Sequence, residues 1–254
     1  MPEPIQVVKI GGKVAENEET LAHFLDEFHA LKGTKILVHG GGVLASTMCR
    51  KLGLEPKMIE GRRVTDRETL DVATMVYAGL INKNVVAKLQ ARGQNAIGVT
   101  GADLNLLTSV KRNPIPIDFG WVGDIERVDG TWFRLFVEQG VVPVLAPLTH
   151  DGKGNLLNTN ADSMASHLAA ELAKKYSVSL TFCFEQPGVM KEGKVVPELS
   201  TDLYAQYKEN KVVTDGMIPK LDLGFYALKS GVESVFIKQF SDLNTPKTGT
   251  VLLS

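Results

Sequence analysis

Short apolar runs alternate with amphipathic helical patterns along most of this 254-residue chain, and this alternation limits the possible folds more than any other feature. The apolar runs predict strands at residues 5–10, 35–38, 96–100, 106–110, 141–145, 178–184, 235–237 and 251–253. Apolar residues at helical spacing predict helices within residues 21–31, 44–52, 65–89, 160–172 and 217–228. Strands separated by helices favour an α/β fold, with a mostly parallel sheet covered by helices on both faces.

Local signals refine several of these boundaries. Thr65 and Glu68 form a capping-box pattern before the longest predicted helix, and Asn160 is placed to cap the helix that follows it. Pro143 lies inside an apolar run, and because proline cannot donate to a central ladder, we expect strand pairing to begin after it. Residues 188–197 interrupt the alternation and predict a hairpin or a mobile loop, and a boundary between two lobes is expected near residues 174–177.

Charge and cysteine content exclude several classes of protein. With 28 Lys+Arg against 29 Asp+Glu, the formal net charge is -1, which gives no indication of a nucleic-acid or membrane partner. Two distant cysteines, Cys49 and Cys183, are typical of a reduced intracellular protein. The first six residues are too short and polar for a signal peptide, and no apolar run approaches the roughly 20 residues that span a bilayer. We therefore expect a cytoplasmic protein.

Two glycine-rich turns each follow an apolar run and precede a helical pattern. They are Lys-Ile-Gly-Gly at residues 9–12 and His-Gly-Gly-Gly at residues 39–42. Ligands collect at the carboxyl ends of parallel strands, and free N–H groups at a helix start attract anions. The dinucleotide pattern G-x-G-x-x-G and the P-loop pattern are both missing from the sequence. A surface lysine at a tight turn would also explain the first motif alone, and glycines needed for tight packing would explain the second.

Four further side chains lie beside predicted helix starts. Asp162 is in the first turn of its helix, and Lys220 is in the first turns of a later one. Arg63 could bind a carboxylate in a bidentate fork, and Asn158 could donate to a ligand carboxylate. Taken singly, a helix-start acid, a solvated lysine, a surface ion pair and a turn cap account for these residues. Together with Lys9 and the glycine turns, they supply the positioning and charge neutralisation that phosphoryl transfer requires.

Five motifs, in this order, resemble those of the amino acid kinase family, and in particular of its members that phosphorylate N-acetylglutamate. They lie at residues 9–12, 39–42, 61–66, 158–162 and 215–220, and the similarity runs along essentially the whole chain. The resemblance implies a three-layer α/β/α sandwich with a mostly parallel central sheet. Residues 1–175 would form a lobe for acyl-glutamate binding and dimerisation, and residues 176–254 a lobe for ATP. The implied activity is ATP-dependent phosphorylation of the γ-carboxylate of an N-acyl-L-glutamate, with acetyl as the expected acyl group, in arginine biosynthesis.

The resemblance also assigns roles to residues by their positions. Lys9 and Lys220 would neutralise charge on the transferring phosphoryl group, and Asp162 would orient both. The other implied roles are phosphate binding by the amides of Gly11 and Gly12, γ-carboxylate binding by Gly41 and Gly42, α-carboxylate binding by Arg63 and Asn158, and nucleotide contacts by Glu185, Gly188, Thr214 and Asp215. Since the acceptor is already a carboxylate, no general base is required, and Mg²⁺ would bridge the ATP phosphates without a protein metal site.

Two departures from the family pattern leave alternatives open. Glu185 stands where the family commonly has an aspartate, and Pro187 removes a backbone donor, so a non-catalytic ligand sensor on the same fold is one alternative. The complete set of lysines and carboxylate argues against it. Lys13 follows the first glycine pair, and a cation there could favour an N-succinyl group in place of N-acetyl. Carbamate, aspartate, free glutamate or a nucleotide are further possible acceptors, although the pair Arg63 and Asn158 favours an amino-acid α-carboxylate.

The resemblance finally implies a homodimer. The long helix at residues 67–89 is the candidate interface. Arginine-inhibited members carry an extra N-terminal helix that links dimers into a ring, and eight residues before Lys9 are too few for one. We therefore expect no arginine feedback.

Overall fold

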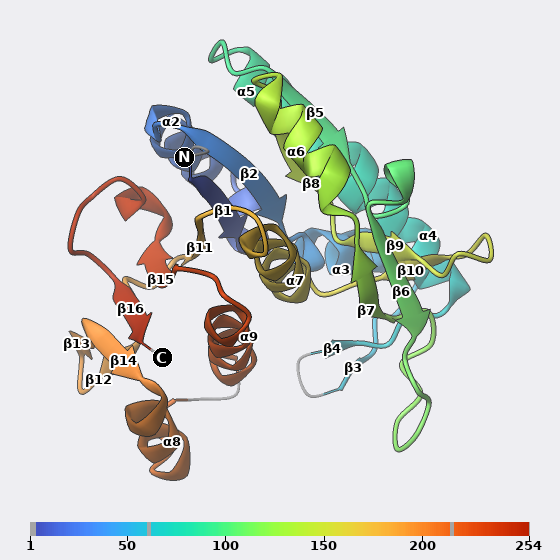
Figure 1. The fold of residues 1–254 in the computed structure, drawn as a ribbon. Helices are drawn as coiled ribbons and strands as arrows, with labels where there is room; N and C mark the ends of the chain where they lie inside the picture. Colours follow the sequence, from blue (N-terminus) through green and yellow to red (C-terminus); the bar gives the residue numbers. More distant parts are fainter. Residues whose placement is uncertain (1–3, 60–61, 214–215, 254) are drawn as a thin grey trace.

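A central sheet organises the computed structural model, which describes residues 4–59, 62–213 and 216–253 (Figure 1). Within these ranges it has eight strands in the order β14-β16-β15-β11-β1-β2-β8-β5, and β15 with β16 is the one antiparallel neighbour pair. The strands, in the same order, are β14 (Glu198–Ser200), β16 (Thr250–Leu253), β15 (Ser234–Gln239), β11 (Val178–Phe184), β1 (Ile5–Ile10), β2 (Thr34–His39), β8 (Val142–Leu145) and β5 (Ala96–Val99). The expected mostly parallel sheet is confirmed.

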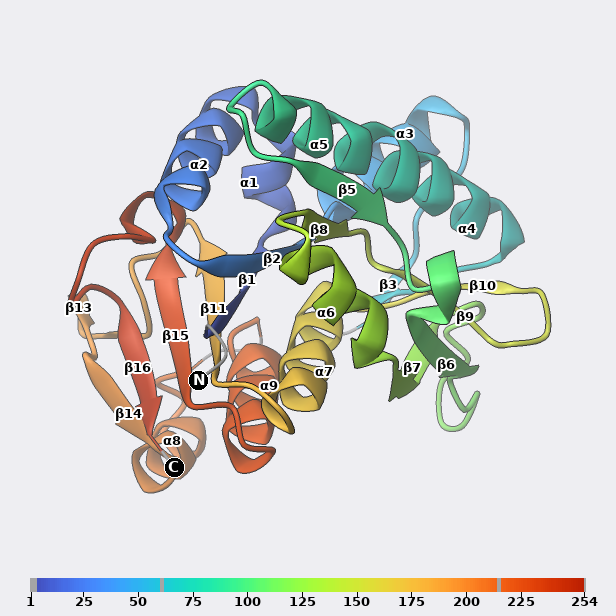
Figure 2. The same ribbon diagram turned by 45° about the horizontal axis from the view of Figure 1, so that its top comes forward.

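Helices cover both faces of this sheet, so the three-layer α/β/α architecture is also confirmed (Figure 2). One face carries α1 (Gly12–Glu16), α2 (Glu18–Ala30), α3 (Gly42–Lys51), α4 (Arg67–Thr74), the π-helix η1 (Met75–Ile81) and α5 (Asn82–Gln90). The other face carries α6 (Gly130–Glu138), α7 (Ala161–Ala173), α8 (Thr201–Glu209) and α9 (Ile218–Lys229). Alternation along β1 sends Val7 into one core and Val8 into the other, as the period of two in a strand requires.

The middle of the sheet sets the position of the glycine turns. β1 pairs in parallel with β11 on one side and β2 on the other, and the register places Ile10 opposite both Cys183 and His39. The carboxyl ends of three adjacent strands are therefore level. Two ladder-type hydrogen bonds continue beyond them, from Gly11 N to Cys183 O at 3.0 Å and from Gly40 N to Ile10 O at 3.0 Å. Both glycine turns thus begin at the edge of the sheet where ligands bind in such folds.

The two halves of the chain share this sheet equally. Residues before 176 supply β1, β2, β5 and β8, and residues after it supply β11, β14, β15 and β16. The junction between the halves is the full-length parallel pairing of β1 with β11. Strand pairing was expected to begin after Pro143. This holds on the β2 side, where β8 is paired only from Val144 onward, but not on the β5 side, where β8 is paired from Val142.

Smaller sheets surround the central one. A four-stranded sheet has the order β10 (Leu156–Asn158), β9 (Leu148–His150), β6 (Leu107–Lys111) and β7 (Gly123–Val128) among the described residues. Two hairpins pair β3 (Met58–Ile59) with β4 (Arg62–Arg63), and β12 (Met190–Lys191) with β13 (Lys194–Val195). The second is the hairpin expected in residues 188–197. In the described part of the chain no helix has the length and apolar character to cross a membrane.

The longest helical stretch differs from the expectation in two ways. Its N-cap is Asp66, whose side chain accepts from Thr69 N at 2.8 Å, so the predicted cap at Thr65 is wrong. Thr65 is instead fully buried, and its hydroxyl is taken by a distant partner described below. The helix also passes through the seven-residue π-helix η1 between α4 and α5. Such segments occur often at functional sites.

Candidate active site

Lys9, Asp162 and Lys220 meet at the centre of the molecule, from three different elements. Lys9 lies near the carboxyl end of β1, Asp162 in the first turn of α7 and Lys220 in the first turn of α9. The ammonium nitrogen of Lys9 is 2.6 Å from Asp162 Oδ1, and that of Lys220 donates to Asp162 Oδ2 at 3.1 Å. Lys9 and Asp162 are buried, whereas the Lys220 side chain is 25% exposed and reaches solvent.

The electrostatics of this trio favour an anionic ligand. Burial alone raises the pKa of Asp162, but the ammonium groups of Lys9 and Lys220 outweigh it and hold that pKa at about 2. The carboxylate is therefore charged at neutral pH. Its Oδ1 faces Lys9 as a close ion pair and, among the described residues, accepts no well-aligned hydrogen bond. Two cations around one carboxylate leave one net positive charge, near the carboxyl end of β1 where the first glycine turn begins.

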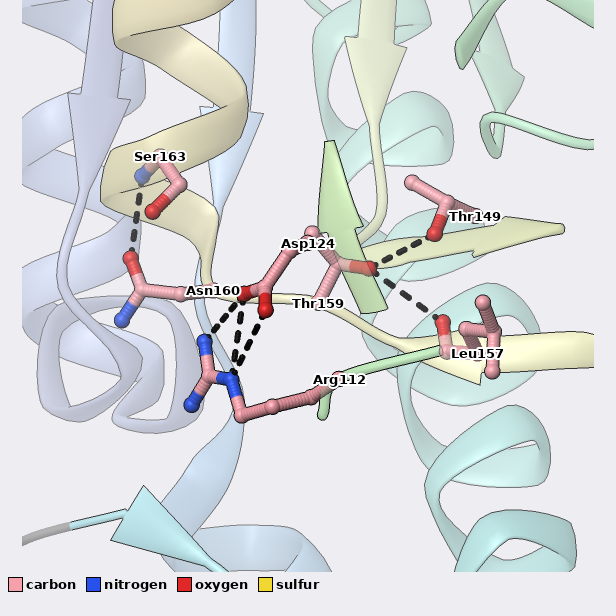
Figure 3. A network of polar contacts seen from close by, with 7 residues as sticks. All are labelled: Arg112, Asp124, Thr149, Leu157, Thr159, Asn160 and Ser163. Atoms are coloured by element: carbon pink, nitrogen blue, oxygen red, sulfur yellow. Dashed lines mark hydrogen bonds and ion pairs between the residues drawn. The ribbon is translucent and has the colours of Figure 1, made fainter. Parts of the chain in front are cut away.

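The local sequence explains why Asp162 is held in place. Asn160 caps α7 by accepting from Ser163 N at 2.9 Å, as its position in the sequence predicted. The hydroxyl of Thr159 lies 2.7 Å from that of Thr149 and donates to Leu157 O at 3.4 Å (Figure 3). These two threonines could not be identified from the sequence, because their contact joins β9 to the residue before the α7 cap.

The two glycine turns abut each other beside the trio. A Cβ built at Gly12 would lie 3.1 Å from Gly41 N and 3.2 Å from Gly42 N, and one built at Gly40 would lie 2.8 Å from Gly12 N. A side chain is thus excluded at Gly40, and one at Gly12 would press against the second glycine turn. α3 starts at Gly42 with Gly41 as its N-cap, and a glycine has no side chain to cap the helix. Burial raises the pKa of Glu16, whose carboxylate accepts hydrogen bonds from the amides of Val43 and Leu44. The amides of Gly41 and Gly42 are therefore the ones that this helix start offers to an anion.

The first glycine of the pair plays a different part. Gly11 N donates to Cys183 O at 3.0 Å, so this amide extends the sheet ladder. The expectation that Gly11 and Gly12 both direct amides to phosphates therefore needs correction for Gly11. Gly12 is the member of the pair that lies against Gly40, Gly41 and Gly42.

Arg63 lies on β4 with its guanidinium turned toward the second glycine turn. It is 8% exposed, and its Nη2 donates to Gly42 O at 2.6 Å and to Ser46 Oγ at 2.7 Å. Nη1 is buried and has no hydrogen-bond partner among the described residues. Tyr77 packs beside it: burial raises the pKa of Tyr77, and the nearby guanidinium partly opposes that rise. The arginine thus places positive charge next to the start of α3.

Asn158 is connected to the same region through Thr65. Its Nδ2 donates to Thr65 Oγ1 at 2.9 Å, and Thr65 Oγ1 donates to Arg63 O at 3.3 Å. This chain joins β10 to β4 and explains why Thr65 does not cap its helix. The structure therefore links the Asn158 side chain to the backbone of Arg63 through the hydroxyl of Thr65.

The residues expected on the nucleotide side are more scattered. Glu185 forms an ion pair with Lys13 at 3.6 Å, with both side chains well exposed. At Gly188 a Cβ would lie 2.8 Å from Thr250 Oγ1, and that hydroxyl accepts from Val189 N and donates to Val196 O. Thr214 and Asp215 lie outside the described residues.

The position of Lys13 bears on the acyl-group alternative. Its side chain is 73% exposed and turns toward Glu185 at the end of β11. The sequence had suggested this cation as a partner for a second carboxylate on the substrate. The ion pair gives Lys13 a different acidic partner and leaves the succinyl alternative without support from the geometry.

Among the described residues, no cluster of three or more His, Cys, Asp or Glu side chains is arranged to hold a metal ion. Cys49 and Cys183 are both buried, with free thiols.

Comparison with known proteins defines the class to which this fold and site belong. Residues 4–239 match the model of the amino acid kinase family, and the chain belongs to that family. The resemblance stated from the motifs is thus confirmed. Its relatives include proteins named acetylglutamate kinase, from Bacteroides thetaiotaomicron, 50% identical over 93% of this chain and 94% of the relative, and from Phocaeicola vulgatus, 47% identical over 99% of each. Among solved structures, smu.665 from Streptococcus mutans superimposes with a TM-score of 0.82 at 26% identity, covering 98% of both chains.

Proposed function

We propose that this protein transfers the γ-phosphoryl group of ATP to the γ-carboxylate of N-acetyl-L-glutamate, as a step of arginine biosynthesis in the cytoplasm. The observation that carries the proposal is the Lys9–Asp162–Lys220 trio beside two abutting glycine turns. It is supported by acetylglutamate kinases that share about half of their residues with this chain over nearly its whole length. An acyl phosphate is the expected product.

Each residue of the site has its own role in phosphoryl transfer. Lys9 and Lys220 neutralise the charge that develops on the phosphoryl group, and Asp162 keeps the two ammonium groups aimed at it. Gly12 directs its amide to the phosphates, and Gly41 and Gly42 direct theirs to the γ-carboxylate. The acceptor oxygen is anionic at neutral pH, so the reaction needs orientation and no base.

Binding of the rest of the substrate falls to Arg63 and Asn158, which would hold the α-carboxylate. Magnesium would be carried by the ATP phosphates, because both oxygens of Asp162 already face lysines. The acyl-glutamate lobe would comprise residues 1–175 and the ATP lobe residues 176–254, with Glu185, Gly188, Thr214 and Asp215 on the nucleotide side. Lys9 and Lys220 come from different lobes, so the trio marks the place where the two substrates meet.

A hydroxamate assay tests the proposed reaction. Hydroxylamine traps acyl phosphates, so the purified protein with Mg-ATP and N-acetyl-L-glutamate should give a coloured hydroxamate. N-succinyl-L-glutamate, run in parallel, is expected to give the weaker signal, because Lys13 is engaged with Glu185. No signal with either substrate would contradict the proposed function, and a stronger signal with the succinyl compound would correct the acyl group.

Arg63→Ala should mainly raise KM for N-acetylglutamate. The buried guanidinium makes contacts expected in both the ground state and the transition state, and loss of such uniform binding raises KM with little change in kcat. Hydrogen bonds to charged groups are worth about 1.5–3 kcal/mol, which corresponds to roughly a 10- to 150-fold increase. Arg62→Ala, on the same strand but exposed, is the matched control. A comparable change in both variants would argue against a specific role for Arg63.

We also infer a homodimer with the helix formed by α4, η1 and α5 at its interface. Met75 and Leu80 on η1 are 57% and 47% exposed, and Ile97 on the edge strand β5 is 37% exposed. Large apolar side chains grouped on an element and on a free sheet edge favour a protein partner. Light scattering should give twice the chain mass of 27.6 kDa, and Leu80→Glu should shift it toward one chain. A mass of 27.6 kDa for the unmodified protein would rule out the dimer.

A further inference from the structure

His39 is a buried titratable residue to which the proposed reaction assigns no part. It is the last residue of β2, is fully buried and directly precedes the second glycine turn. Burial lowers the pKa of His39 to about 4; the hydrogen bond with the Gly40 carbonyl opposes this, and the charges of Lys83 and Lys9 add to it. The ring is therefore neutral at pH 7, with one nitrogen that donates and one that accepts.

A chain of groups with fixed polarity determines which nitrogen carries the proton. Lys83 Nζ, which can only donate, lies 3.1 Å from Asn82 Oδ1, so that oxygen faces the lysine. Asn82 Nδ2 then points the other way, donating to Val144 O at 2.9 Å and lying 3.2 Å from His39 Nε2. Because an amide nitrogen only donates, Nε2 must accept. The ring proton is left on Nδ1, which lies 2.9 Å from Gly40 O and donates to it.

The surroundings of Asn82 keep this polarity from reversing. Asn82 is 1% exposed, and Lys83 Nζ also donates to Gly98 O at 2.9 Å, which ties the lysine to β5. A Cβ at Gly98 would overlap Asn82 Oδ1. The asparagine amide is thus enclosed by a donor on its oxygen side and acceptors on its nitrogen side.

This series of hydrogen bonds ends at the Gly40–Gly41 peptide and fixes its orientation. In a trans peptide the carbonyl and the following N–H point in opposite directions. Holding Gly40 O against the His39 ring therefore turns Gly41 N–H away from it, and Gly41 N lies on the Gly12 side, 3.1 Å from the position of a Gly12 Cβ. Three successive glycines have wide backbone freedom of their own, so an external contact is needed to keep one orientation.

We propose that His39 is a positioning residue for phosphoryl transfer: its Nδ1–H, fixed in that tautomer by Asn82 and Lys83, locks the Gly40–Gly41 peptide so that the Gly41 amide faces the acceptor carboxylate. This role rests on the proposed function of Gly41. The proposal also gives the buried pair His39 and Asn82 a common role, since together they connect β2, β8 and the start of α5 to the glycine turn.

Paired substitutions of His39 separate this role from simple packing. In His39→Asn the side-chain amide lies where Nδ1 was and can still donate to Gly40 O, whereas in His39→Gln it lies nearer the position of Nε2. His39→Asn should keep kcat within a few-fold, and His39→Gln should lose about 10²-fold in kcat, as when an oxyanion-type donor is misplaced. KM for ATP should change little in either variant. Exposed His29→Gln on α2 is the control.

The tautomer itself is measured without substrate. Two-bond ¹H–¹⁵N correlation spectra of protein labelled at the histidine rings, with His39 assigned by its loss in His39→Asn, should show the proton on Nδ1 at pH 7. Asn82→Asp, which replaces the donor to Nε2 by an acceptor, should move the proton to Nε2 and lower kcat.

Two results would overturn the proposal: an Nε2–H tautomer in the unmodified protein, or equal kcat for folded His39→Asn and His39→Gln variants. If neither variant folds, the tautomer decides. Absence of acyl-glutamate turnover in the unmodified protein would refute the proposed function and leave the tautomer result standing.

Discussion

Lys220→Ala is expected to lower kcat by about 10²–10³-fold and to leave KM for N-acetylglutamate nearly unchanged. The Lys220 ammonium is anchored to Asp162 at 3.1 Å and is partly exposed, so it can follow the phosphoryl group as charge develops. An interaction that strengthens only in the transition state raises kcat without tightening ground-state binding. Lys9→Ala should have a similar effect, because Lys9 holds the other oxygen of the same carboxylate.

Steady-state kinetics with a coupled ADP assay would measure these effects. Lys229→Ala is the matched control, because Lys229 is an exposed lysine at the other end of α9. The double variant Lys9→Ala, Lys220→Ala should lose less than the product of the single losses, since the two lysines share one carboxylate and act as a unit. Full kcat in Lys220→Ala would refute the mechanism.

Asp162→Asn is expected to destabilise the protein by about 3 kcal/mol at pH 7 as well as to impair catalysis. The carboxylate and Lys9 are both buried, and removing one partner leaves a buried cation without its counter-ion. Urea denaturation followed by circular dichroism would give the difference. Glu126→Gln removes an exposed carboxylate from β7 and should change the stability far less.

The difference in free energy of unfolding between the unmodified protein and Asp162→Asn should become smaller at low pH. The pKa of Asp162 is about 2 in the folded protein against 3.8 for the free side chain, so the unfolded chain binds more protons between these values. The extra stability of the unmodified protein over Asp162→Asn is therefore fully present above about pH 4 and is lost as the pH falls toward 2. His39 destabilises both proteins equally as the pH falls from 6.5 toward 4, so it cancels from the difference. A difference that stayed constant from about pH 6 down to about pH 2 would contradict the ion-pair explanation.

The sequence predicted the elements that carry long apolar runs or strong caps. β1 and β11 were predicted at their observed bounds, and Asn160 as the cap of α7, because these signals are local. α6 and α8 were not predicted. Each has nine residues, which is short for a helix to be recognised by apolar spacing, and α6 directly follows the strand β7. The π-helix was also missed, since a helical period near 3.6 does not reveal it.

The candidate site was predictable to the extent that each residue marks a strand end or a helix start. Lys9, Asp162 and Lys220 satisfy that condition, and the topology brings such positions together. Contacts that join distant segments could not be predicted from the sequence. Thr65 was assigned as a cap because Asn158, its partner, lies 93 residues away. Likewise, the register of β1 against β11 decides that Gly11 belongs to the ladder and Gly12 does not.

The shared sheet has a consequence for how the chain can be synthesised. β1 is made first, yet one of its two edges is covered only by β11, whose last residue is number 184. On the ribosome, β2 can join β1 early, while the other edge of an apolar strand stays open for most of translation. Open strand edges invite pairing with other chains, and pairings between segments distant in sequence form slowly. Aggregation through the central strand is therefore most favoured before residue 184 has been made.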